Sequence, residues 1–148
     1  MDPRIASSPR DSVFHLLRVV LQEHGTRWAE RLTEPGVRDV TKPQYAILRA
    51  VAANPGLDQA AAGQFTGTDK ATVTAMLDRL QRRGLLTRDV HPDDRRRRQL
   101  HLTPRGEELL AAMTPTVDHL NEELLSRLSD AERGQLTALL TKLAGQQS

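Results

Sequence analysis

The chain contains no cysteine among its 148 residues and is poor in aromatic side chains, with one Trp, one Tyr and two Phe. The missing thiols exclude disulfide bonds, thiolate metal ligands and thiol-based redox sensing. No apolar run approaches the roughly 20 residues needed to cross a bilayer, and the start lacks the apolar segment of a secretory signal. We therefore expect a soluble protein of the cytoplasm that makes no membrane contact.

The core must be built mainly from leucine, valine and alanine, because hydrophobic residues make up 38% of the chain and aromatic residues only 3%. Alanine and leucine are among the best helix formers, so this composition favours helices. The length suits a single domain with an additional layer for dimerisation.

Positive charge is concentrated in the middle of the chain. Residues 68–105 carry a net charge of +5, whereas residues 106–148 carry −4. A basic patch raises the local concentration of a polyanion and supplies affinity that does not depend on sequence. Basic stretches are also common as solvated faces, so charge alone does not identify a partner.

The N-terminal part predicts a disordered tail over residues 1–10 and a helix over residues 11–34. This helix has two neighbouring apolar stripes, one from Phe14 through Trp28 to Leu32 and one through Val13 and Val20. A helix with two apolar stripes buries more than one flank, so we expect it to lie between its own domain and a partner.

A helix-turn-helix pattern follows. Three helices are predicted: one that Thr41 and Gln44 begin as a capping box and Asn54 ends, a short one that Asp58 caps and that closes near Gly67, and one from Asp69 to Arg83. In the third helix Val73, Leu77 and Leu80 point inward, and Gly84 stands where a left-handed C-cap residue belongs. Two short helices with a tight turn between them are typical of DNA-binding proteins.

The run of four arginines, Arg95 to Arg98, lies between two segments with strand character, Leu85–Val90 and Gln99–Leu102. We predict a β-hairpin with a charged turn. Thr103-Pro104 then begins a long amphipathic helix that Pro115 is expected to kink, and a capping box at Ser129 and Glu132 opens a last helix.

These elements and motifs resemble the MarR family of winged helix-turn-helix regulators. Asp94-x-Arg96, followed by Leu102-Thr103 and Gly106, is similar to the family's wing signature. Thr72-Val73-Thr74 and Arg83-Gly84-Leu85 resemble its recognition-helix stretch. The resemblance implies a mainly α fold with a small β-hairpin wing. A single domain would then span residues 11–148, with the winged helix-turn-helix at about 41–103 and dimerisation helices at 11–34 and 104–145.

The resemblance also implies a function. Members of this family are homodimers that bind a pseudo-palindromic operator on double-stranded DNA, usually as repressors, and often release it when a small molecule binds. Gly56–Gln59 and Asp69–Val73 are similar to the branch that controls aromatic-acid catabolism. Two alternatives remain open: a weakly sequence-selective architectural DNA-binding protein without an inducer, and a winged-helix scaffold for protein partners.

The predicted DNA-binding residues form two groups. On the outer face of the third helix and at its start they are Thr68, Lys70, Ala71, Thr72, Thr74, Ala75 and Arg79. Small residues let the backbone approach base edges, and threonine offers a hydroxyl and a methyl group. In the wing they are Asp94, Arg95, Arg96, Arg97 and Arg98. The resemblance places Arg96 in the minor groove with Asp94 orienting it, although the two additional arginines, Arg97 and Arg98, leave that choice open.

A ligand site is a further prediction. The family often holds its ligand near the first two helices, where His15, Arg18, Trp28, Tyr45 and Arg49 could stack an aromatic ring and neutralise a carboxylate. The alternative is that Trp28 belongs to a dimer core and His15 to the surface. The five histidines are scattered without metal-ligand spacing, and no catalytic motif is present, so we expect no metal, no cofactor and no enzymatic activity.

Overall fold

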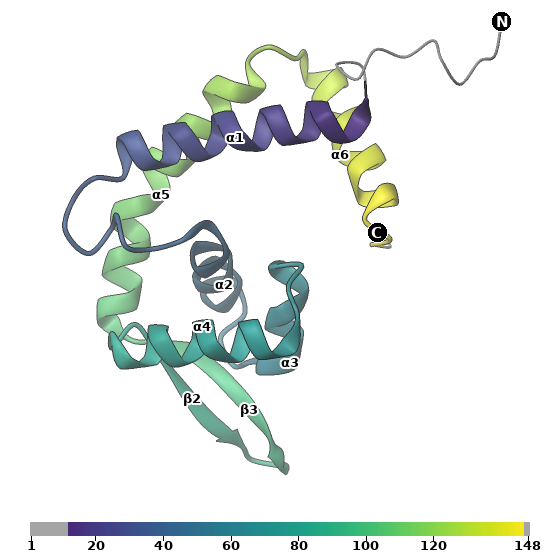
Figure 1. Cartoon of the computed structure of the whole chain (residues 1–148). Helices are drawn as coiled ribbons and strands as arrows, with labels where there is room; N and C mark the ends of the chain where they lie inside the picture. The colour runs from purple at the N-terminus through teal and green to yellow at the C-terminus, as the bar shows by residue number, and fades with distance from the viewer. Residues whose placement is uncertain (1–11, 147–148) are drawn as a thin grey trace, which may run out of the picture. The chain divides into compact units, whose positions relative to one another are not determined.

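The computed structural model describes residues 12–146, so the tail predicted for residues 1–10 lies outside the described residues. The elements, shown in Figure 1, are α1 (Val13–Arg31), α2 (Lys42–Ala53), β1 (Leu57–Asp58), α3 (Gln59–Ala62), the 3-10 helix η2 (Gly63–Phe65), α4 (Lys70–Arg82), β2 (Leu86–His91), β3 (Asp94–Leu102), α5 (Pro104–Leu125) and α6 (Asp130–Leu143). The chain is mainly helical with a small antiparallel sheet, which confirms the predicted fold class. Among the described helices none is long and apolar enough to span a bilayer.

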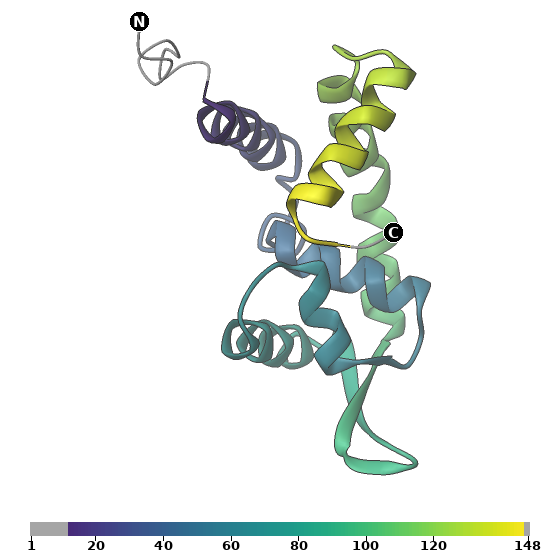
Figure 2. The same ribbon diagram turned by 90° about the vertical axis from the view of Figure 1, so that its right-hand side faces the viewer.

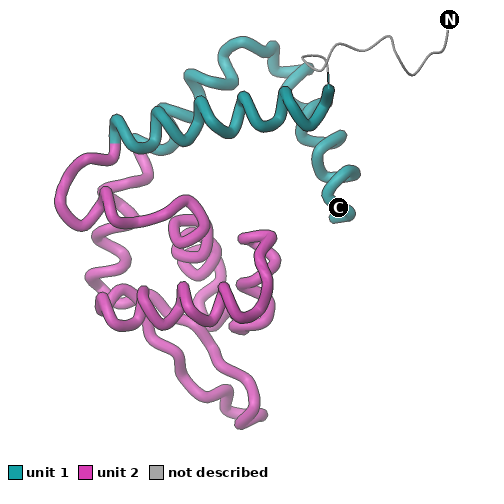
Figure 3. The backbone as a smooth tube through the Cα atoms, viewed as in Figure 1, with its two compact units in different colours: residues 1–31, 116–148 teal, residues 32–115 magenta. Residues whose placement is uncertain are grey.

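The chain divides into two compact units (Figure 3). Residues 32–115 form one, which we call the winged unit, and residues 1–31 with 116–148 form the other, which we call the helical unit. Helix α5 contributes to both, and the division falls directly after Pro115, the proline inside this helix.

The winged unit opens with the predicted capping box. The backbone N–H of Gln44 donates to Thr41 Oγ1 at 3.3 Å, and the N–H of Thr41 donates to Gln44 Oε1 at 3.1 Å. Helix α2 then buries Ile47, Leu48 and Val51 completely or nearly so. The cap fixes where the helix starts, and the apolar face fixes it in the core of the unit.

Helices α3 and α4 form the helix-turn-helix. Asp58 caps α3, and the α-helical hydrogen bonding gives way to the 3-10 turn at Gly63. Helix α4 buries Val73, Leu77 and Leu80, as predicted. Gly84 has a φ of 70°, which confirms the left-handed C-cap expected from the sequence.

The sheet has the strand order β1-β3-β2, with β3 antiparallel to both neighbours. The hairpin of β2 and β3 projects beyond α2, α3 and α4 in both ribbon views (Figures 1 and 2). Strand β1 supplies only two pairs, Leu57 with Leu100 and Asp58 with Gln99. This short strand was not predicted, because two residues carry no alternation and pairing alone defines them.

The predicted strand bounds need a correction. Strand β3 begins at Asp94 rather than Gln99, so all four arginines lie in a strand and not in a loop. The turn is confined to the tip near His91 and Asp94, where the register shifts. The outer hairpin is exposed on both sides, so its strands need only backbone pairing and show no apolar alternation in the sequence.

The start of α5 packs closely against the segment that follows α4. Thr103 Oγ1 accepts the N–H of Gly106 at 3.1 Å and donates to the carbonyl of Gly84 at 2.5 Å. A Cβ atom on Gly106 would collide with the backbone of Leu85. The Leu-Thr-x-x-Gly segment therefore has a structural cause. The threonine caps α5, and the glycine leaves room for the backbone of Leu85.

In the helical unit, α1 ends at Arg31 and not at Glu34 as predicted. A turn over residues 34–39 follows, in which Gly36 has a φ of 85°. The apolar stripe read through Leu32 thus crosses the helix end, and Leu32 is buried in the next segment. The apolar spacing of the helix therefore continues beyond Arg31, its last residue.

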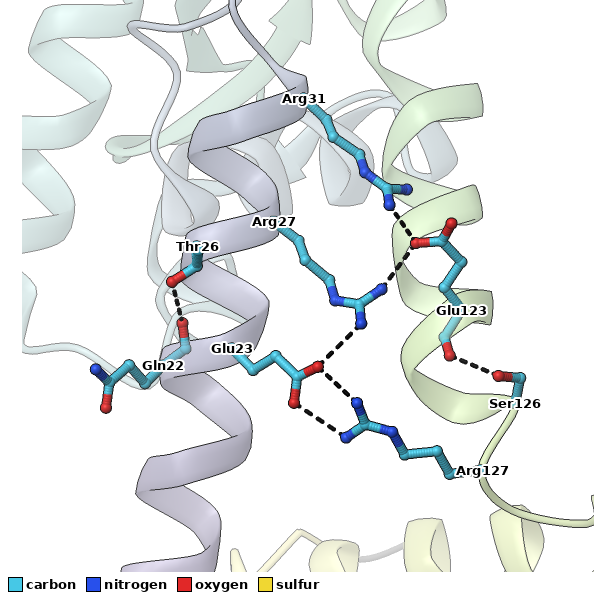
Figure 4. A network of polar contacts seen from close by, with 8 residues as sticks. All are labelled: Gln22, Glu23, Thr26, Arg27, Arg31, Glu123, Ser126 and Arg127. Atoms are coloured by element: carbon cyan, nitrogen blue, oxygen red, sulfur yellow. Dashed lines mark hydrogen bonds and ion pairs between the residues drawn. The ribbon is translucent and has the colours of Figure 1, made fainter.

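Ion pairs join α1 to the C-terminal half of α5 and to the turn that follows it (Figure 4). Glu23 accepts from Arg127 at 2.7 Å and from Arg27 at 2.9 Å, and Glu123 accepts from Arg27 at 2.8 Å and from Arg31 at 2.5 Å. The Arg127 and Arg27 guanidiniums lower the pKa of Glu23, and Arg31 does most to lower the pKa of Glu123. Two carboxylates are thus held ionised between three arginines.

Helix α6 begins with the predicted capping box, in which Ser129 Oγ accepts the N–H of Glu132 and the Glu132 carboxylate accepts the N–H of Ser129. Its leucines nevertheless stay exposed. Leu139 and Leu143 expose 66% and 62% of their surface, and Phe14 and Leu21 of α1 expose 70% and 63%. A single chain therefore leaves apolar faces of its helical unit in contact with water.

Candidate nucleic-acid interface

The outer face of α4 presents the side chains that the sequence predicted. Lys70, Ala71, Thr72, Ala75 and Arg79 are exposed, Thr74 is half-buried, and Thr68 is exposed just before the N-cap Asp69. Because Val73, Leu77 and Leu80 occupy the opposite face, the predicted residues lie on the surface that α4 turns away from its own core. Their contact with DNA stays a prediction.

The two threonines of α4 use their hydroxyl hydrogens within the helix. Thr72 Oγ1 donates to Asp69 Oδ2 at 2.7 Å, and Thr74 Oγ1 donates to the carbonyl of Lys70 at 3.0 Å. The Thr72 contacts also hold the pKa of Asp69 below its ordinary value. What remains for a base edge is the oxygen lone pairs and the methyl groups, which suit an amino hydrogen or a thymine methyl.

The wing arginines divide into held and free groups. Arg97 Nε donates to Asp58 Oδ2 at 2.6 Å, and Arg98 donates to the carbonyls of Arg95 and Arg97 at 2.8 and 3.2 Å. The guanidiniums of Arg95 and Arg96 make no hydrogen bond or ion pair with any described residue and are exposed. Asp58 was predicted only as a helix cap, and no sequence signal pointed to Arg97 as its partner.

Asp94 holds the tip of the wing through the backbone. Its Oδ1 accepts the N–H of Arg96 at 2.9 Å, while the N–H of Asp93 donates to His91 Nδ1 at 3.1 Å. Asp94 thus contacts Arg96 through the backbone N–H, and its role in orienting the Arg96 side chain stays a prediction. No hydrogen bond joins the Asp94 carboxylate to the Arg96 guanidinium within the described part of the chain.

Arg88 of β2 also joins the wing to the helix-turn-helix, here through α4. Its guanidinium pairs with Asp78, and its Nε donates to Gln81 Oε1 at 2.8 Å. These residues were not among the predicted functional ones, because an isolated arginine in a strand gives no signal about which helix it faces. Arg88 lies inside the ladder between β2 and β3, opposite Leu100.

A cleft of about 550 Å³ lies between α3, α4 and the wing. The residues that line it are Asp58, Gln59, Ala60, Gly63, Gln64, Thr68, Lys70, Val73, Thr74, Arg96, Arg97 and Arg98. It brings predicted residues of the helix together with predicted residues of the wing. A groove with free cationic groups on both walls can receive a phosphate-bearing strand.

Electrostatics favour a polyanion at this surface. The side chains of Lys70 and Arg79 in α4, like those of Arg95 and Arg96 in β3, make no hydrogen bond or ion pair with the residues that the structure describes. Their charges are therefore available for phosphates, whereas Arg88 and Arg97 are neutralised by carboxylates.

The predicted ligand residues fall in both units. In the helical unit Trp28 is buried and its ring lies 6.2 Å from that of His24, while His15 is half-buried and Arg18 exposed. In the winged unit the Arg49 guanidinium lies 6.0 Å from the ring centre of Tyr45, whose hydroxyl donates to Thr114 at 3.3 Å. The ligand site itself stays a prediction.

Comparisons with known proteins identify the family of this chain. Residues 38–97 match a sequence model described as MarR family. The transcriptional regulator HosA of Escherichia coli O111:H- is 42% identical over 134 residues, which cover 90% of this chain and 96% of HosA. The HTH-type transcriptional repressor NicR of Pseudomonas putida is 31% identical over 133 residues, covering 90% of this chain and 82% of NicR.

Solved structures give the same result. The PcaV transcriptional regulator of Streptomyces coelicolor, in complex with its natural ligand, superimposes with a TM-score of 0.84 at 33% identity, over 95% of this chain and 96% of PcaV. BpsR of Bordetella bronchiseptica superimposes with a TM-score of 0.82 at 28% identity, over 93% of this chain and 96% of BpsR.

The fold and the relatives therefore define a DNA-binding protein of the winged helix-turn-helix class. The chain belongs to the MarR family and is a transcriptional regulator.

Proposed function

We propose that the protein is a homodimeric repressor that binds a pseudo-palindromic operator and leaves it when a small aromatic carboxylate binds. Each protomer contributes one recognition helix, α4, and one wing. With twofold symmetry, the two half-sites lie about one helical turn apart, or 10 to 10.5 base pairs centre to centre.

The observation that carries the DNA-binding part is the cleft between α4 and the wing. Its walls carry Lys70 and Arg96, both exposed and neither with a side-chain hydrogen bond or ion pair to a described residue, beside small side chains of α4. Small residues allow the helix backbone to approach the major groove. A narrow, A·T-rich minor groove concentrates negative potential and attracts the Arg96 guanidinium.

The dimer is supported by the apolar side chains that the helical unit leaves exposed. They lie on α1, with Phe14 and Leu21, and on α6, with Leu139 and Leu143. Apolar surface of this kind is costly in water and marks a site of association. A second copy of the chain presents the same faces, so a twofold interface can bury all of them at once.

A ligand-controlled release is supported by relatives. The DNA binding of BpsR is regulated by 6-hydroxynicotinic acid, and the structure of PcaV contains its natural ligand. An aromatic carboxylate is therefore the class of effector to test first. The ligand acts as a switch only if it binds the DNA-free conformation better than the DNA-bound one.

The experiment begins with selection of duplexes from a random library by the purified protein. A repressor should enrich one palindromic family and bind it at least about a thousandfold more tightly than random duplex at 150 mM salt. A panel of aromatic carboxylates is then titrated against the complex. A protein that enriches no sequence is an architectural DNA binder, and a complex that no carboxylate weakens refutes the inducer.

A further inference from the structure

Asp58 has three structural roles at one position. Its backbone pairs with Gln99 in the short ladder of β1 and β3, and its Oδ1 accepts the N–H of Ala60 at 2.8 Å as the cap of α3. Its Oδ2 accepts from Arg97 Nε at 2.6 Å. One carboxylate therefore connects the first helix of the helix-turn-helix with the outer part of the wing.

The position of this contact along the strand is informative. The ladder between β1 and β3 ends at Asp58 and Gln99, so among the described strands the arginine run beyond it has only β2 as a neighbour. In this outer part the register with β2 also shifts, between Val90 and His91. The Asp58–Arg97 pair extends the support of β3 past the point where backbone pairing with β1 stops.

The other strand is supported in a matching way. Arg88 of β2 pairs with Asp78 and Gln81 of α4, the recognition helix. Each strand of the wing is therefore tied by an arginine to a different helix of the helix-turn-helix. Together these contacts set how far the wing lies from α4, which is the distance that two adjacent DNA grooves must match.

The Asp58 carboxylate is suited to this role because it is already ordered. The cap hydrogen bond fixes it, and only 20% of its side chain is exposed, against 50% for Arg97. Holding Arg97 in place therefore orders one side chain and not two. The Arg97 guanidinium and the Ala60 amide also hold the pKa of Asp58 below its usual range, so it is ionised at neutral pH.

Charge gives the pair a second consequence. Asp58 and Arg97 both line the cleft, beside Arg96 and Lys70. A carboxylate at this place repels phosphate and neutralises one arginine, so it weakens binding to every duplex. Such a residue improves discrimination if the geometry it fixes favours the correct duplex by more than it loses in general affinity.

We propose that Asp58 is a positioning residue for DNA recognition, which holds the wing through Arg97 and withdraws that arginine from phosphate binding. The inference rests on the proposed function. Arg97 is then not a DNA-reading residue, and of the four wing arginines Arg95 and Arg96 carry the contacts.

The test uses Asp58→Asn, Arg97→Gln and the double variant, with the duplex that wild type enriches and a random-sequence duplex as probes. Asparagine is also a good helix cap, so Asp58→Asn keeps the start of α3 while losing the charge. Thermal unfolding monitored by circular dichroism checks that all variants fold.

For Asp58→Asn we expect affinity for random duplex to rise about threefold to tenfold, with a salt slope steeper by about 1 per protomer. Affinity for the enriched duplex should not rise by the same factor. The ratio of affinity for the enriched duplex to affinity for random duplex therefore falls about threefold to tenfold. For Arg97→Gln the ratio should fall similarly while the salt slope stays unchanged. In the double variant the ratio should equal that of Arg97→Gln alone, because Asp58 acts through Arg97.

Two results would overturn the inference. If Asp58→Asn strengthens both complexes equally, the residue acts only through its charge. If Arg97→Gln flattens the salt slope by about 1 per protomer, Arg97 contacts phosphate directly. Either result leaves the proposed repressor intact, whereas a wild-type protein that enriches no duplex removes both proposals.

Discussion

The backbone of Leu85 occupies the space in which a side chain on Gly106 would begin. The N–H of Thr103 donates to the carbonyl of Leu85 at 3.1 Å, and Thr103 Oγ1 caps α5 through Gly106. The segment that follows α4 and the start of α5 are thus fixed to each other through one close approach. The position of the wing, which lies between them in sequence, depends on it.

Gly106→Ala should destabilise the protein by about 1–3 kcal/mol, because the added methyl group overlaps the Leu85 backbone, which cannot move aside cheaply. The matched control is Gly134→Ala in α6, where no atom lies within 4 Å of the new Cβ. That change should stabilise by about 0.5–1 kcal/mol, since alanine is the better helix former. Urea unfolding of both variants at one protein concentration measures the difference, and equal effects at the two sites would contradict the close approach.

Acid should weaken the helical unit through Glu23 and Glu123. The arginines lower the pKa of both carboxyls in the folded chain, so the folded state binds fewer protons than the unfolded state. Their contribution is therefore complete above the ordinary carboxyl pKa, about 4.3, and is lost as the pH falls through the lowered folded values.

The matched variant is Glu123→Gln, which cannot titrate at this position. Wild type should be the more stable protein at pH 7, and its advantage in urea midpoint should shrink steadily as the pH is lowered below about 4.5. An advantage that stays constant down to pH 3 would mean that the contacts of Glu123 do not depend on its charge.

Dimerisation should depend on the exposed leucines of α6. The double variant Leu139→Gln, Leu143→Gln keeps good helix formers but removes apolar surface, and burial of one leucine contributes about 1.5–3 kcal/mol. The dissociation constant of the dimer should rise by at least about a hundredfold, as measured by sedimentation equilibrium. Val90→Gln, which changes an exposed apolar residue of the wing, should leave it unchanged. Equal dimerisation of all three proteins would place the interface elsewhere.

Local signals in the sequence predicted most of the fold. The capping boxes at Thr41 and Ser129 and the left-handed Gly84 were read correctly, because each depends on a few neighbouring residues. The buried face of α4 was predicted from its period for the same reason. The family resemblance was confirmed by relatives that cover nearly the whole chain.

Features that depend on distant residues could not be predicted. Strand β1 exists only through its two pairs with β3, and the pair of Asp58 with Arg97 joins positions 39 residues apart. For the arginine run the sequence predicts a charged turn of the hairpin, because its strand character comes from pairing with β2. The end of α1 was placed three residues late because Leu32 continued the apolar period beyond the helix.

The most direct test of the account compares Arg96→Ala with Arg38→Ala, an exposed arginine outside the predicted interface, on the enriched duplex over a range of salt. We expect Arg96→Ala to weaken binding at least about tenfold and to flatten the salt slope by about 1 per protomer, with the dimer intact and Arg38→Ala unchanged. Hydroxyl-radical footprinting should lose the minor-groove protection next to each half-site. Binding and protection that survive the loss of Arg96 would show that the wing does not touch DNA.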